Sequence, residues 1–134
     1  MDSAAGFHRT MAATAESADQ FRRQFTVWVD SLGTSLERRS DIVLGVYEAL
    51  ANAVEHAYSM HPTPGPVTVQ AQLDLTGALN ISVTDVGIWK TEEPARFRGR
   101  GLPLIAALSD TCALSTGSDG TVVTLHWEQI RRDL

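Results

Sequence analysis

Cysteine and positive charge are scarce in this 134-residue chain, and each scarcity excludes a class of protein. The one cysteine, Cys112, cannot form a disulfide within the chain, and it lies in an apolar stretch. We therefore expect a structural thiol that packs as a small apolar side chain. Lysine and arginine number 11 against 16 acidic residues, for a net charge of -5, which disfavours nucleic acid as the main partner.

Long apolar runs are also missing. No window reaches the roughly 18 apolar residues that a membrane span needs, and the first residues do not resemble a secretory signal. The sequence therefore predicts a cytoplasmic protein with no membrane partner. A hydrophobic content of 43% is typical of a globular chain. We expect one domain over residues 15–134, preceded by a loosely ordered lead-in over residues 1–14.

Two helices are predicted in the first half of the chain. The first has an amphipathic stripe that ends at Gly33. Its apolar positions are Phe21, Phe25, Trp28, Val29 and Leu32. The second opens with the capping-box pattern Thr34–Glu37 and continues to about Tyr58, before a proline-rich loop over residues 62–66.

Four strands and a short helix are predicted in the second half. Alternation of apolar and polar residues, together with turn signals, places the strands. They cover residues 67–75, 79–85, 111–116 and 121–128. A long loop over residues 86–101 leads into the short helix at 102–108, and Gly117–Gly120 is a strong turn signal. These elements predict an α/β two-layer sandwich (α+β), with helices on one face of a mixed, mostly antiparallel sheet.

Glu48 and Asn52 stand out because their neighbours in the second helix are alanine and aliphatic residues. Four residues of spacing place the carboxylate and the carboxamide on one helical face. Burying an unpaired carboxylate costs on the order of several kcal/mol, so a buried pair would indicate a ligand. The alternative is a surface helix whose polar stripe also carries Glu55 and His56.

Two further features carry possible chemistry. In the strand over residues 79–85, Asp85 falls on the same face as the apolar residues, which predicts a buried carboxylate. Gly99 and Gly101 precede a helix, where backbone N–H groups can approach a phosphate. This pattern is neither a complete Rossmann fingerprint nor a Walker loop.

In this order, these features resemble the GHKL family of ATP-binding domains, and more closely its small bacterial branch, the RsbW-type anti-sigma-factor serine/threonine kinases. The resemblance extends over roughly residues 15–128, nearly the whole chain. The segments that carry it are Glu48–Ala57, Val83–Gly87, Arg98–Ile105 and Gly120–Leu125. Each segment alone is a weak signal, and four in the family's order are a strong one.

The resemblance implies a Bergerat-type fold that binds ATP and Mg²⁺. Asn52 is then the Mg²⁺ ligand, a role that suits a carboxamide oxygen. Glu48 is the general base that accepts the proton of a Ser or Thr hydroxyl. Asp85 accepts a hydrogen bond from the adenine amino group, and Gly87 and Thr121 belong to the same pocket.

The resemblance also implies that a lid contacts the phosphates. The lid residues concerned are Arg98, Gly99, Arg100, Gly101 and Leu102. For the two arginines, solvated loop side chains are an equal alternative. Ile88 and Trp89 follow Gly87, so the second glycine of many family members is absent. This departure and the short lid favour the small kinase branch over sensor histidine kinases and the larger chaperone-type members.

The implied function is an ATP-dependent serine/threonine protein kinase that acts as an anti-sigma factor in bacterial transcription regulation. It would phosphorylate an anti-anti-sigma (STAS) partner, sequester a sigma factor and form a homodimer. The alternative is a non-catalytic module that binds nucleotide or sequesters a partner without phosphate transfer. The presence of Glu48 favours the kinase, because sequestration needs no base.

Overall fold

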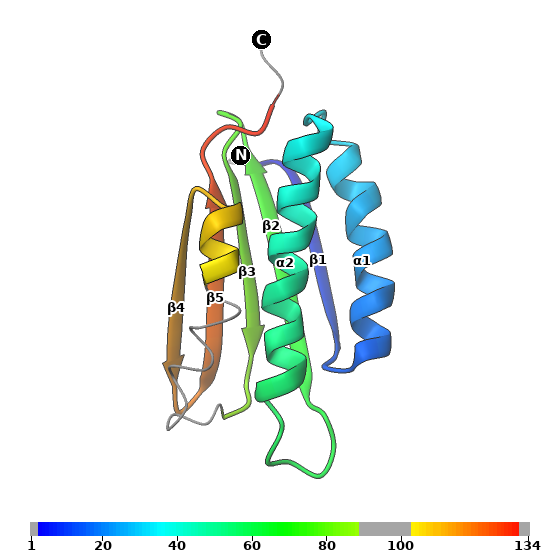
Figure 1. Ribbon diagram of the computed structural model, residues 1–134, viewed down its shortest axis with the longest axis vertical. Coiled ribbons are helices and arrows are strands. Elements are labelled where there is room, and N and C mark those ends of the chain that lie inside the picture. The colour runs from blue at the N-terminus through cyan, green and yellow to red at the C-terminus, as the bar shows by residue number, and fades with distance from the viewer. Residues whose placement is uncertain (1–2, 89–102, 132–134) are drawn as a thin grey trace.

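A five-stranded antiparallel sheet with helices on one face forms the structure, a computed structural model that describes residues 3–88 and 103–131 (Figure 1). The strand order is β1-β2-β3-β5-β4, and every neighbouring pair is antiparallel. The strands are β1 Ser3–Ala12, β2 Pro66–Asp74, β3 Leu79–Asp85, β4 Thr111–Gly117 and β5 Gly120–Trp127. The helices are α1 Ala15–Asp30 and α2 Leu36–His56, with a short helical segment at residues 103–108. The predicted two-layer sandwich is confirmed.

The prediction of a loosely ordered lead-in over residues 1–14 was wrong for residues 3–12. Ser3–Ala12 form an edge strand that pairs with β2 along its length. The alternation of apolar and polar residues in β1 is weak, because Phe7 is the one large side chain of this strand that is buried, while Ala5 and Met11 are partly buried. An edge strand rich in small residues therefore gives little periodicity, although its main chain pairs with β2 on one side.

The predicted apolar residues of α1 lie on one face of the helix, and their aromatic rings form a cluster with Phe7 of β1. Phe7 meets Phe25 edge-to-face with ring centroids 5.4 Å apart, and Phe21 stacks on Phe25 at 5.1 Å. Trp28 completes the cluster against Phe7 and Phe25. These contacts fix α1 over the β1 side of the sheet.

The long helix α2 lies over the middle of the sheet, runs along the strands and packs beside α1 (Figure 1). It begins one residue later than expected, because Ser35 rather than Thr34 is the N-cap and its side chain accepts from the N–H of Arg38. Its buried face is apolar with one exception. The buried residues are Ile42, Gly45, Val46, Ala49, Leu50, Asn52 and Ala53.

The central strands alternate as the sequence predicted. Val67, Val69, Ala71 and Leu73 are buried under the helices, whereas the intervening residues of β2 face away from them. Asp74 closes the turn to β3 by accepting from the N–H groups of Thr76 and Ala78. Within the described residues, no helix is long and apolar enough to cross a membrane.

Candidate functional site

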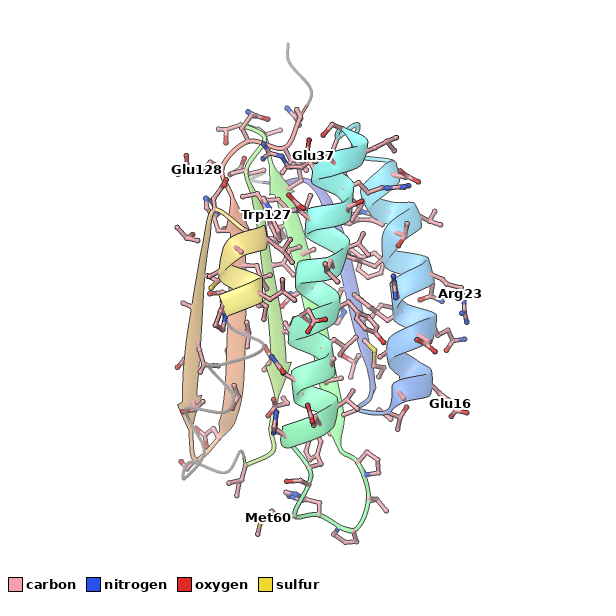
Figure 2. All side chains as sticks on the ribbon, viewed as in Figure 1. Glu16, Arg23, Glu37, Met60, Trp127 and Glu128 are labelled. Carbon is pink, nitrogen blue, oxygen red and sulfur yellow. The ribbon has the colours of Figure 1, made fainter. Side chains whose placement is uncertain are left out.

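Three elements meet at one end of the molecule, where α2 stops and β3 gives way to a loop (Figure 1). In the sheet, Asp85 at the end of β3 pairs with Thr121 at the start of β5. The N–H of Ile88 donates to the carbonyl of Ala57, 3.0 Å away, which ties the segment after β3 to the end of α2. Met60 projects from the loop at this end, far from Glu37 and Trp127 at the other (Figure 2). The fold therefore brings the second half of α2 to the ends of two central strands.

Asn52 is the polar exception on the buried face of α2. Its side chain is only 8% exposed, and its Nδ2 has no hydrogen-bond partner among the residues that the structure describes. Leaving a buried amide unpaired costs about 1–3 kcal/mol. A buried carboxamide that lowers stability in this way indicates a site where a bound ligand supplies the missing polar interactions.

Glu48 lies one helical turn before Asn52 and is half-buried, whereas Glu55 on the same helix is exposed. The alternative of a polar surface stripe is therefore wrong for Asn52 and holds for Glu55. The edge of the buried face is a position from which a carboxylate can reach a bound substrate without being fully desolvated.

Asp85 and Thr121 are both buried, with exposed fractions of 3% and 2%. The predicted inward-facing carboxylate is confirmed. One carboxylate oxygen of Asp85 accepts the N–H of Gly87 at 3.0 Å, which closes a tight turn at the end of β3. The carboxylate is thereby held in one orientation beside the strand ends.

Gly87 and Gly120 allow the main chain to come close to itself around Asp85. A Cβ on Gly87 would overlap the Ala57 carbonyl oxygen and lie 2.6 Å from its carbon. A Cβ on Gly120, whose φ is +128°, would overlap the Asp85 carbonyl oxygen and lie 2.7 Å from Val86 Cα. The structure thus gives Gly87 a packing role, and its expected contact with a purine stays a prediction.

Tyr58 is a residue of this site that the sequence patterns did not single out. Its hydroxyl donates to the carbonyl of Pro66 at 2.6 Å and accepts the N–H of Val86 at 3.0 Å. The feature of the sequence that could have indicated Tyr58 is its place at the end of an apolar helix, shortly before a proline-rich loop. Burial raises the pKa of Tyr58 above its ordinary value of 10.0, the bond from Val86 opposes this, and the charge of Asp85 adds to it.

The raised pKa of Tyr58 predicts a pH dependence of stability. The folded state favours the neutral phenol, so its contribution is fully present below pH 10.0 and is lost as the pH rises through the folded-state pKa. We expect the difference in Tm between wild type and Tyr58→Phe to narrow as the pH rises above 10.0. Thermal melts monitored by circular dichroism measure it, and a difference that stays constant would contradict the prediction.

The five predicted lid residues lie outside the described residues. They are Arg98, Gly99, Arg100, Gly101 and Leu102. Their contact with phosphate therefore stays a prediction. The segment that contains them joins Ile88 to the short helix at 103–108, and so begins at the turn that carries Asp85.

The described residues fit a magnesium nucleotide. Within residues 3–88 and 103–131, no three His, Cys, Asp or Glu side chains are grouped closely enough to hold a metal by themselves. A single carboxamide suits Mg²⁺, which keeps several waters and takes other ligands from phosphates. Asn52 would hold the metal, and Asp85, at the strand ends, would hold the base of the nucleotide.

A separate hollow of about 300 Å³ lies on the open face of the sheet. Its lining includes Gln70, Gln72, Asn80 and His126, which alternate with residues buried under the helices. Asn80 and His126 are joined by a 2.7 Å hydrogen bond. Since the sheet separates this hollow from Asn52, it does not belong to the candidate site.

Comparisons with known proteins agree with this fold. The family model of the histidine kinase-like ATPase domain matches residues 11–127. The RsbU and RsbW domains of Rv1364c from Mycobacterium tuberculosis are similar in structure, with a TM-score of 0.78 and 30% identity over 96% of this chain and 33% of that chain.

A blue-light activated histidine kinase, EL346 of Erythrobacter litoralis, shares the fold with a TM-score of 0.61 and 24% identity over 71% of this chain and 31% of that one. The chain thus spans about a third of the length of each of these two structures. The family match extends over most of the sequence and includes α2, Asp85 and Thr121. This chain therefore belongs to the family of histidine kinase-like ATPase domains.

Proposed function

We propose that the chain is an ATP-dependent serine/threonine protein kinase that acts as an anti-sigma factor in the bacterial cytoplasm. Its substrate would be an anti-anti-sigma (STAS) protein, and it would bind a sigma factor as a homodimer. The observation that carries the proposal is the buried Asn52 carboxamide, whose Nδ2 has no partner in the part of the chain that the structure describes, one helical turn from the half-buried Glu48. The similarity to a chain with an RsbW domain supports the choice of partners.

In the proposed reaction, Glu48 accepts the proton of a Ser or Thr hydroxyl on the partner. The hydroxyl oxygen forms a bond to the γ-phosphorus, the bond from that phosphorus to the bridging oxygen breaks, and ADP leaves. Asp85 holds the adenine, and Asn52 holds Mg²⁺. The metal, when bound, neutralises charge on the phosphates.

Transfer of phosphate tests the kinase directly. Purified protein is incubated with radiolabelled Mg-ATP and a STAS protein from the same organism, and the partner is analysed for phosphoserine and phosphothreonine. We expect label on one hydroxyl of the partner. ATP binding without transfer would contradict the kinase and favour a non-catalytic module that binds nucleotide. Absence of ATP binding would contradict the kinase and favour a module that only sequesters a partner.

Asp85→Asn tests the adenine contact separately. An asparagine oxygen can still accept the N–H of Gly87, but the charge-assisted bond to the adenine amino group is lost. We expect the Kd for ATP to rise about 10- to 100-fold, which corresponds to ~1.5–3 kcal/mol. Titration with a fluorescent ATP analogue measures the change.

Asp74→Asn is the matched control, because Asp74 ends the other side of the β2–β3 hairpin and closes its turn. This variant should bind ATP as wild type does. Equal affinity in the two variants would refute the assignment of Asp85.

A further inference from the structure

Tyr58 joins three segments that are far apart in the sequence. The residue follows the last turn of α2, its hydroxyl donates to Pro66 at the start of β2, and it accepts from Val86 just after β3. Both partners are main-chain atoms, one in the first residue of β2 and the other in the residue that follows β3. The hydroxyl is therefore a junction between the helix layer and two adjacent strands.

Two glycines make room for the Tyr58 ring. A Cβ on Gly65 would lie 2.5 Å from Cε1 and 2.6 Å from Cζ of the ring, and a Cβ on Gly87 would lie 2.9 Å from Cε1. Real Cβ atoms do not approach a ring so closely, so any larger residue at either position would displace it. The ring position is consequently determined by main chain from both loops, and Tyr58 is only 8% exposed.

The two ends of the nucleotide site lie on different elements. Asn52 belongs to α2, whereas Asp85 is the last residue of β3, directly before the turn. Hydrogen bonds that join the end of α2 to this turn run from Ile88 to Ala57 and from Val86 to Tyr58. The first uses main chain alone, so of these two bonds only the one to the Tyr58 hydroxyl is removed by a side-chain substitution.

We propose that Tyr58 is a positioning residue of the nucleotide site, because its hydroxyl holds the turn of Asp85 and Gly87 against the end of α2. The hydroxyl thereby sets the spacing between the carboxylate that binds adenine and the carboxamide that binds the metal. The proposal rests on the proposed function, since it requires that the site binds ATP. Tyr58 acts through Asp85 and does not touch the nucleotide.

Tyr58→Phe keeps the ring between its neighbours and removes only the hydroxyl. The Val86 N–H and the Pro66 carbonyl then lose this partner, and the turn samples other positions. When only a fraction of molecules is competent to bind, the apparent Kd rises by the inverse of that fraction. We expect the Kd for ATP to rise about tenfold and the preference for ATP over GTP to fall by a similar factor.

The experiment compares wild type, Tyr58→Phe and Tyr47→Phe, well below their melting temperatures. Tyr47→Phe removes the same group from α2 at a place where the ring lies under Arg22, so it should leave both nucleotide affinities unchanged. Hydrogen exchange of the Val86 and Ile88 amides is followed without nucleotide. It should be faster in Tyr58→Phe than in the other two proteins.

Each result decides between specific claims. A merely structural role would lower the Tm of Tyr58→Phe but leave its Kd and its ATP-to-GTP ratio as in wild type, and would overturn the proposal. Saturating ATP should also slow hydrogen exchange at the Val86 amide of wild type, and this test needs no variant. An unchanged exchange rate would likewise overturn the proposal. If wild type binds no ATP, the proposed function fails together with this inference, whereas ATP binding that is indifferent to Tyr58→Phe refutes the inference alone.

Discussion

Replacing Glu48 by Gln is expected to lower phosphate transfer to the partner about 10²- to 10⁴-fold, while ATP affinity changes by less than about threefold. Glutamine has nearly the shape of glutamate but cannot accept the hydroxyl proton. The half-buried position at the edge of the α2 face means that the substitution leaves no buried charge unpaired. Single-turnover transfer from labelled ATP separates the chemical step from binding.

Glu55→Gln provides the control on the same helix. Glu55 is exposed, so its replacement removes the same charge from α2 without touching the buried face. Transfer and affinity should both equal those of wild type. Transfer by Glu48→Gln at more than a tenth of the wild-type rate would exclude Glu48 as the base, and an equal loss in both variants would point to overall charge instead.

Gly120→Ala should have the largest effect on stability of the substitutions considered. Its φ of +128° disfavours any side chain, and the new Cβ would overlap the Asp85 carbonyl oxygen. Relief requires that β3 and β5 separate at the Asp85–Thr121 pair, which also displaces the carboxylate that we propose binds adenine. We expect the free energy of unfolding to fall by about 3 kcal/mol or more and ATP binding to be lost. Urea denaturation and nucleotide titration measure the two effects.

Gly117→Ala is the natural comparison, because Gly117 and Gly120 face each other across the same turn. At Gly117 a Cβ would meet nothing within 4 Å, and its φ is not positive. The free energy of unfolding should change by no more than about 0.5 kcal/mol. Similar losses in the two variants would show that the turn, rather than the contact with Asp85, limits stability.

Much of the fold could be predicted because the periodic pattern is strong wherever one face is buried. The alternation from Val67 to Asp85 gave both central strands, and the same alternation placed the Asp85 side chain inside. In α2, the alanine-rich surroundings of Asn52 indicated a buried helix, as observed. Position in a regular element was thus enough to locate two of the site's polar groups.

The parts of the fold and site that could not be predicted depend on contacts between residues far apart in the sequence, which the pattern of apolar and polar residues does not reveal. The strand β1 was missed because small residues give no clear period, and its stability comes from pairing with β2 more than 50 residues later. The bonds of Tyr58 to Pro66 and Val86 were missed because they join main-chain atoms that only the folded chain brings together. The need for a glycine at position 87 could not be predicted either, because it arises from the close contact between the main chain of Gly87 and the carbonyl of Ala57.

The tight packing of the glycines around Asp85 also determines which sequence changes can be compensated. Gly87 and Gly120 each face a main-chain carbonyl, which every amino acid carries, so no second substitution elsewhere can make room for a side chain there. Gly65 differs, because the atoms that it faces belong to the Tyr58 ring, and a smaller residue at position 58 would free the space. Relatives with a side chain at position 65 should therefore carry a smaller residue at position 58 and lack the Tyr58 hydroxyl, whereas positions 87 and 120 should stay glycine.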